Sequence, residues 1–193
     1  CFFDHAGIES ARLAGNSMGG VVSLCTAMDA PARVARLALV GTPTYVGPRP
    51  WFFKPLKWPL LGGVYESLLG PFGESMVRLI ARTAFKDASL IPQEAIKEYS
   101  MSLRRPGGRR AATEILRNAH PPDAAQRIAQ YKNLEHPVLV LCGDSDGVVD
   151  LESARRFSAE VKRGRFYPID ACGHAAQEEK PEIVTQALEE FFA

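Results

Sequence analysis

A serine at position 17 is flanked by glycines in a way that suits a reactive hydroxyl. The segment Gly15-Asn16-Ser17-Met18-Gly19 has the pattern G-x-S-x-G, between a short apolar run and a helical pattern. In that context the serine stands on a sharp turn, and glycines on both sides are expected to relieve collisions with the backbone. The sequence predicts Ser17 as a nucleophile and the Met18 backbone N–H as a donor to a developing oxyanion.

The same glycine-rich turn could instead feed a helix that binds a phosphate group. A dinucleotide-binding turn would require G-x-G-x-x-G, and a P-loop would require a G-K-[ST] ending. Neither pattern is present around Ser17, where Gly19 is followed by Gly20 and an apolar run. The nucleophile interpretation is therefore favoured.

A serine hydroxyl needs a base that takes its proton and a third group that orients the base. Only His174 lies in a turn directly after a predicted strand, where parallel sheets place their functional loops. We predict His174 as the base, and the alternative is a solvated loop histidine. The chain contains four histidines, at positions His5, His120, His136 and His174.

The acid is expected in the loop GDSDGVVD, which offers Asp144, Asp146 and Asp150. Asp150 stands directly before a helical pattern and is expected to cap that helix, while Asp144 could simply turn the chain. Asp146, deeper in the loop, is the predicted acid. The order Ser17, Asp146, His174 is one of the known chain orders of hydrolytic triads, and it differs from those of trypsin-like and subtilisin-like proteases.

Strands and helices alternate on both sides of a long middle block. This alternation predicts the α/β class, with a mostly parallel sheet and helices packed on its faces. The expected strands cover residues 11–15, 33–43, 136–143 and 164–170, and the expected helices cover 18–30, 123–131, 151–162 and 181–192.

The middle block, residues 44–122, is predicted to be a helical cap inserted into a core formed by residues 1–43 and 123–193. Residues 45–63 are rich in Pro, Gly and aromatic residues without a clear period. Helical patterns follow over residues 74–85, 92–103 and 108–120.

Two features of the block have open interpretations. Its aromatic residues could pack the interior of the cap or line an apolar substrate tunnel. The run from Arg104 to Arg110 could be a solvated connection or could bind a substrate carboxylate. The aromatic residues are Trp51, Phe52, Phe53 and Trp58.

The chain resembles the α/β-hydrolase superfamily over nearly its whole length. Three motifs carry the resemblance: GNSMGG, GDSDGVV and GHAAQEEKP. The last two resemble the family patterns G-x-x-D-x-x-V and G-H-x-x-x-x-E-x-P, so that Asp146 and His174 fall on the acid and the base. Many relatives have Pro where this chain has Asp150. The resemblance implies a partial α/β-hydrolase fold, in which the strands are equivalent to the fifth to eighth of the family and the cap follows the sixth.

The resemblance also narrows the chemistry. Haloalkane dehalogenases and epoxide hydrolases of this fold carry Asp where this chain has Ser17, so both are disfavoured. The motif GNSMGG is frequent in hydrolases that cleave the carbon–carbon bond of meta-ring-fission products, and it also occurs in esterases.

Family members usually have four strands before the one that leads to the serine, and a second oxyanion donor follows the third of them. Only residues 1–10 precede the first predicted strand here. We therefore expect the whole 193-residue chain to correspond to the C-terminal two thirds of a hydrolase. We also expect the 193-residue chain on its own to be poorly soluble or inactive, because an edge of the sheet would be open.

The leading functional prediction is a serine hydrolase that cleaves a carboxylic ester or related small, apolar acyl substrate through an acyl-enzyme. The first alternative is a carbon–carbon bond hydrolase of the meta-cleavage-product type. The second alternative, from another class, is a non-catalytic binding module. No metal or organic cofactor is required by the proposed triad, and a metal site formed by Cys142, Cys172 and His174 is disfavoured because His174 already has a role.

The composition does not favour binding to nucleic acid or to a membrane. Hydrophobic residues make up 46% of the chain, charged residues 23%, and the net charge is +1, which gives no reason to expect binding to nucleic acid or an anionic membrane surface. No apolar run approaches the roughly 20 residues of a membrane-spanning helix.

The four cysteines are expected to be free thiols, with a Cys142–Cys172 contact as the alternative. No signal peptide is visible and a cytoplasmic location is expected, although a leader could precede Cys1.

Overall fold

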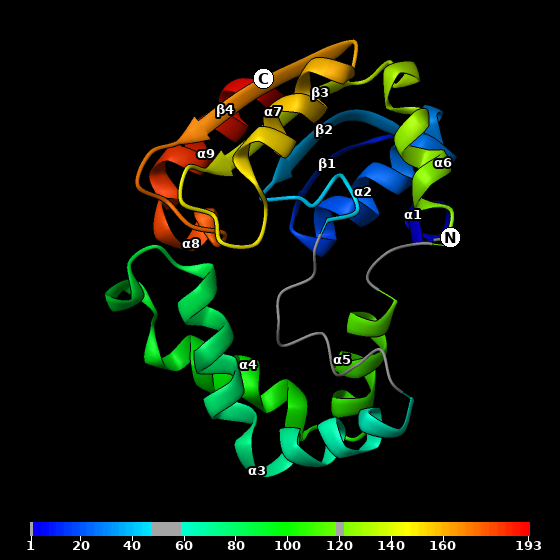
Figure 1. Cartoon of the computed structure of the whole chain (residues 1–193). Helices are drawn as coiled ribbons and strands as arrows, with labels where there is room; N and C mark the ends of the chain where they lie inside the picture. The colour runs from blue at the N-terminus through cyan, green and yellow to red at the C-terminus, as the bar shows by residue number, and fades with distance from the viewer. Residues whose placement is uncertain (1, 48–58, 119–121) are drawn as a thin grey trace.

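Four parallel strands form the sheet of the computed structural model, which describes residues 2–47, 59–118 and 122–193. The strands are β1 (Ala11–Asn16), β2 (Val34–Val40), β3 (Pro137–Gly143) and β4 (Arg163–Ile169), and they lie side by side in chain order. Strands β2 and β3 are nearly continuous runs of Val, Leu and Ala that are buried on both faces, as is typical of parallel sheets covered by helices. The predicted α/β class with a parallel sheet is confirmed (Figure 1).

The register brings the carboxyl ends of all four strands to one edge of the sheet. Asn16, the last residue of β1, pairs with Val40 at the end of β2. Gly143, the last residue of β3, pairs with Ile169 at the end of β4. Ser17, the loop with Asp146 and the turn with His174 therefore leave the sheet at the same edge.

Helices cover both faces of the sheet, each with its own apolar cluster. One face packs against α2 (Met18–Asp29) and α7 (Leu151–Glu160), which contribute buried Leu24 and Phe157. The other face packs against α8 (Ala176–Glu179), which contributes Ala176, and against α9 (Pro181–Phe192), which contributes Val184 and Phe191. Burial of each such side chain stabilises the fold by roughly 1.5–3 kcal/mol.

Short elements connect the larger ones. α2 is followed by the 3-10 turn η1 (Pro31–Arg33), and β3 is preceded by α6 (Ala124–Ala129) and η4 (Tyr131–Asn133). The short helix α1 (Phe2–His5) is held by Arg33, whose guanidinium pairs with Asp4 and donates to the Ile8 carbonyl.

Three helices fill the described part of the middle block, with a 3-10 turn η3 (Ala88–Leu90) between the first two. They are α3 (Pro59–Ala84), α4 (Gln93–Arg104) and α5 (Gly108–Arg117), which pack on one another and face the carboxyl edge of the sheet (Figure 1). The three predicted helical patterns are confirmed. The boundaries of a separate cap at residues 44 and 122 stay a prediction, and the four aromatic residues of the cluster lie outside the described residues.

Helix α3 begins earlier than its sequence pattern predicts. The helical pattern was expected from Glu74, but the helix begins at Pro59 and contains Pro71 in its interior. Proline is well suited to the first turn of a helix, whereas an interior proline removes one hydrogen bond and usually kinks or ends the helix. Packing of α3 against α4 and α5 outweighs this local preference.

The three described cysteines, Cys25, Cys142 and Cys172, are free thiols, which confirms the prediction for these positions. Burial raises the pKa of Cys142 to about 12 and that of Cys172 to about 11. Both therefore remain protonated at neutral pH and pack as apolar groups. Within the described residues, no helix combines the length and the apolar character needed to cross a membrane.

Candidate active site

Ser17 occupies the single residue between β1 and α2, and its backbone is strained. Its φ is 51° and its ψ is −119°, a conformation that side-chain-bearing residues rarely adopt. The Ser17 N–H donates to the Val40 carbonyl at 2.9 Å, and the Ser17 carbonyl accepts from the Gly20 N–H at 3.0 Å. These bonds fix the turn that carries the side chain, as predicted for a strand-to-helix nucleophile turn.

The glycines around Ser17 have different roles. A Cβ on Gly15 would overlap the backbone of Gly19, and a Cβ on Gly20 would overlap the Thr42 side chain. At Gly19 a Cβ would meet no atom within 4 Å. Glycine therefore avoids a close contact at Gly15, whereas no atom outside the helix backbone approaches a side chain at Gly19.

The Met18 N–H opens the first turn of α2, next to Ser17. In the part of the chain that the structure describes, no group accepts a hydrogen bond from it. The first N–H groups of a helix lack partners within the helix and favour negative charge beside them. This N–H is therefore available to an anionic oxygen bound at Ser17.

His174 and Asp146 are directly hydrogen bonded. The His174 Nδ1 lies 2.9 Å from the Asp146 Oδ2, and the Asp146 side chain is fully buried while His174 is 11% exposed. The other oxygen, Oδ1, accepts from the Val148 N–H at 2.8 Å and the Val149 N–H at 2.9 Å. The carboxylate is thus held by two backbone donors and presents one oxygen to the imidazole, as required of a group that fixes the His174 ring.

The other two acidic candidates have structural roles. Asp150 caps α7 by accepting from the Ser153 N–H at 2.9 Å, which confirms that expectation. Asp144 is exposed and accepts from the Cys172 N–H and the Ser145 hydroxyl. Backbone hydrogen bonding at Ala171 lowers the pKa of Asp144 below its usual range. Asp144 therefore holds the turn before His174, and only Asp146 contacts the imidazole.

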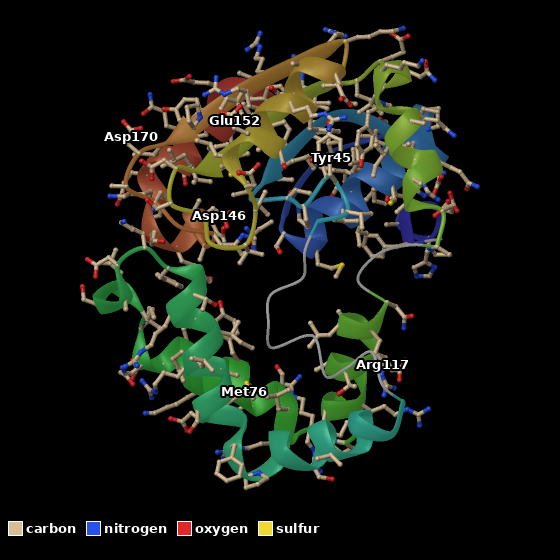
Figure 2. All side chains as sticks on the ribbon, in the orientation of Figure 1. Tyr45, Met76, Arg117, Asp146, Glu152 and Asp170 are labelled. Carbon is tan, nitrogen blue, oxygen red and sulfur yellow. The ribbon has the colours of Figure 1, made fainter. Side chains whose placement is uncertain are left out.

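A side chain that the sequence did not single out connects the serine turn to the histidine loop. The Asn16 Nδ2 donates to the Val40 carbonyl at 3.1 Å and to the His174 carbonyl at 3.2 Å. No direct hydrogen bond joins the Ser17 hydroxyl to the His174 ring among the described residues. Such bonds often tighten only when substrate is bound. Figure 2 shows the labelled Asp146 in the loop on the side of the sheet that faces α3, α4 and α5.

Gly41, directly after β2, lies against the His174–Asp146 pair, and the sequence did not single it out. Its φ is 50°, and a Cβ there would lie 3.1 Å from the His174 Nδ1 and 3.2 Å from the Asp146 Oδ2. A side chain at this position would press on the two atoms that form the His174–Asp146 hydrogen bond.

Replacing Gly41 with alanine is expected to destabilise the protein by roughly 1–3 kcal/mol through backbone strain. Any hydrolytic kcat at this site is expected to fall by about tenfold or more, since the ring is displaced. Gly47→Ala is the matched control, because a Cβ at Gly47 meets nothing within 4 Å. Denaturant unfolding and turnover assays on both variants measure the two effects, and equal behaviour of the pair would contradict this role of Gly41.

The remaining sequence candidates that the structure describes form no hydrogen bond with Ser17, Asp146 or His174. His5 is exposed in α1, and the His136 Nε2 lies 2.9 Å from the Pro31 carbonyl. His120 lies outside the described residues. Residues Arg104, Arg105, Arg109 and Arg110 are all exposed around the α4–α5 connection. Over residues 2–47, 59–118 and 122–193, no group of three His, Cys, Asp or Glu side chains could hold a metal ion.

Comparison with known proteins gives consistent results. The model of the alpha/beta hydrolase fold family matches residues 1–181. A 2-hydroxy-6-oxononadienedioate/2-hydroxy-6-oxononatrienedioate hydrolase of Paraburkholderia phymatum is 31% identical over 97% of this chain and 64% of its own length.

Two solved structures of hydrolases superpose on nearly the whole chain. The 2-hydroxy-6-oxo-6-phenylhexa-2,4-dienoate hydrolase of a Rhodococcus species superposes with a TM-score of 0.77 at 27% identity, covering 98% of this chain and 66% of that one. A thermophilic esterase from Thermogutta terrifontis superposes with a TM-score of 0.75 at 25% identity, covering 99% and 68%. The chain therefore spans about two thirds of the length of these proteins.

Proposed function

The chain belongs to the alpha/beta hydrolase fold family, and on that premise we propose that it is a serine hydrolase whose triad is Ser17, Asp146 and His174. The observation that carries the proposal is the 2.9 Å hydrogen bond between His174 and the buried Asp146, at the sheet edge that also carries the strained Ser17. Strained residues next to a buried histidine–carboxylate pair are a frequent arrangement at catalytic sites.

In the proposed reaction the His174 Nε2 takes the proton of the Ser17 hydroxyl as the oxygen attacks a substrate carbonyl. Asp146 holds the proton on Nδ1 and stabilises the imidazolium that forms. The Met18 N–H donates to the oxyanion. Collapse of the intermediate breaks the bond to the leaving group, which takes the proton from His174, and water then releases the acyl group from Ser17.

We further propose that the bond broken is a carbon–carbon bond beside a ketone in a conjugated oxo-acid. Support comes from the two hydrolases above that are named for 2-hydroxy-6-oxo acids, of which one is 31% and the other 27% identical. A carbon leaving group can depart from the Ser17-bound intermediate once the 2-hydroxy-diene has taken its keto form, in which the 2-hydroxyl proton is lost and C5 is protonated. The electron pair of the broken C5–C6 bond then delocalises through the remaining double bond onto the 2-oxo group, which takes the proton from His174. This proposal replaces the carboxylic ester, the leading substrate class on sequence alone.

A carboxylic ester is the second candidate. The Thermogutta esterase, at 25% identity and a TM-score of 0.75, supports it. Both reactions pass through the same acyl-enzyme on Ser17, so the triad geometry serves either one. They differ only in the leaving group, which is a carbon acid in one case and an alcohol in the other.

Steady-state assays with a 2-hydroxy-6-oxo-dienoate and with a p-nitrophenyl ester separate the two candidates. We expect kcat/KM for the dienoate, followed by loss of its visible absorbance, to exceed that for the ester by about 100-fold, or roughly 2.7 kcal/mol of transition-state stabilisation. A protein that turns over the ester and leaves the dienoate intact would contradict the carbon–carbon assignment and retain the serine hydrolase.

A further inference from the structure

Glu179 is a buried carboxylate outside the triad, and both of its oxygens accept hydrogen bonds from backbone N–H groups. It ends α8 and is 7% exposed. Its Oε2 accepts from the Lys86 N–H and the Gly173 N–H, each at 2.9 Å, and its Oε1 accepts from the Asp87 N–H at 3.3 Å. One side chain therefore joins two segments that are far apart in the sequence.

One segment is Gly173, the residue before His174. The other is Lys86 and Asp87, which follow the end of α3. Ala84, the last residue of α3, also contacts the histidine loop, because its carbonyl accepts from the His174 N–H at 2.5 Å and the Ala175 N–H at 3.3 Å. Three consecutive backbone N–H groups, from residue 173 to residue 175, are thus fixed by Glu179 and by the end of α3.

The contact is direct and closely packed. A Cβ on Gly173 would lie 2.6 Å from the Lys86 nitrogen and 2.7 Å from the Glu179 Oε2. The carboxylate therefore meets the Lys86 and Gly173 N–H groups directly, each at 2.9 Å. The position of the histidine backbone therefore depends on how far the Glu179 side chain reaches.

We propose that Glu179 is a positioning residue, which sets the orientation of His174 by holding its loop against the chain that follows α3. This proposal rests on the proposed function, since it assumes that His174 is the base. The length of the side chain is what matters, because the Oε2 atom must meet both the Lys86 and the Gly173 N–H groups. Its charge matters less, since a glutamine can place its single carbonyl oxygen at the Oε2 position and gives up only the longer, 3.3 Å bond from the Asp87 N–H.

A pair of substitutions separates length from charge. Glu179→Gln keeps the length and loses the charge, and Glu179→Asp keeps the charge and is one methylene shorter. Glu182→Gln is the control, since Glu182 is an exposed glutamate on the neighbouring helix α9. We expect Glu179→Gln and the control to stay within about threefold of the parent kcat, and Glu179→Asp to lose on the order of 10- to 100-fold in kcat with little change in KM.

A second measurement does not require turnover. The ring proton shared by the His174 Nδ1 and Asp146 is expected to give a low-field NMR resonance in the parent protein and in Glu179→Gln, and to shift or broaden in Glu179→Asp. If the parent protein keeps this resonance but hydrolyses nothing, the proposed function fails and the positioning role is still decided by the spectrum.

Three results would overturn the proposal. The first is a folded Glu179→Asp protein with the parent kcat and the parent resonance. The second is a Glu179→Asp effect confined to KM, which would place the residue in substrate binding. The third is a Glu179→Gln protein that does not fold or that loses as much activity as Glu179→Asp. The effect of replacing Glu179 would then come from its charge or from overall stability, and not from the length of its side chain.

Discussion

Replacing Ser17 with alanine is expected to lower kcat by about 10⁴-fold or more, because the reaction then lacks the nucleophile that forms the acyl-enzyme. The fold should be unaffected. Alanine and serine have the same difficulty in adopting the φ of 51° found at this position, so the strain and the free energy of unfolding change little. Glycine at the same position is expected to stabilise the protein while being equally inactive.

The control is a serine of the neighbouring loop. Ser145 lies next to the proposed acid. Its hydroxyl donates to Asp144 and its N–H to the Cys172 carbonyl, and within the described residues it forms no hydrogen bond with His174 or the Ser17 turn. Ser145→Ala should keep the parent kcat within a few-fold. Steady-state turnover of the dienoate, with circular dichroism to verify folding, measures both variants. A folded Ser17→Ala protein with parent activity would mean that another group is the nucleophile.

Replacing Asp146 with asparagine is expected to lower kcat by about 10⁴-fold, the size of effect known for the corresponding change in a serine protease. The asparagine can still accept from the Val148 and Val149 N–H groups through its carbonyl oxygen. Its amide group then faces the His174 Nδ1, which favours the tautomer that cannot take a proton from Ser17.

Two neighbouring aspartates are matched controls for this change. Asp144 accepts from the Cys172 N–H at 3.3 Å and Asp150 from the Ser153 N–H at 2.9 Å. Replacing either one with asparagine therefore removes a loop carboxylate that is bonded to the backbone but not to His174. We expect both variants to keep kcat within about tenfold and to differ in stability by no more than about 1–2 kcal/mol, the usual effect of a helix cap. If Asp144→Asn or Asp150→Asn abolishes turnover while Asp146→Asn is active, the acid has been assigned to the wrong residue.

The sequence predicted the parts of this fold that depend on local patterns. Apolar runs in β2 and β3 and the order of strands and helices were sufficient for the parallel sheet. The G-x-S-x-G pattern was sufficient to predict the Ser17 turn, because the backbone conformation of that turn depends mainly on neighbouring residues. Asp146 could be separated from Asp150 because capping is also a local property.

The features that were missed depend on residues distant in sequence. Gly41 is important because its Cα faces the His174–Asp146 pair, and Asn16 because its amide reaches the His174 carbonyl. The start of α3 at Pro59 depends on packing against α4 and α5 rather than on its own composition. Glu179 falls on the glutamate of the family pattern G-H-x-x-x-x-E-x-P, but no role followed from the pattern, and its contacts with Lys86 and Asp87 required the structure.

Substrate class could not be predicted from the triad, because esters and oxo-acids present the same carbonyl to Ser17. The choice between an ester and an oxo-acid depends on the side chains that contact the leaving group, and no local sequence motif identifies those side chains. The similarity to hydrolases named for 2-hydroxy-6-oxo acids is the reason to test the carbon–carbon bond first.

The central claim is that Ser17 is a nucleophile activated by His174, and covalent labelling tests it most directly. The protein would be treated with a fluorophosphonate, digested with trypsin and analysed by mass spectrometry. The peptide between Arg12 and Arg33 contains two serines, Ser17 and the buried Ser23, which fragment ions distinguish. We predict a single adduct on Ser17 that is lost in His174→Ala. Labelling at another residue, or no labelling of the folded protein, would contradict the account.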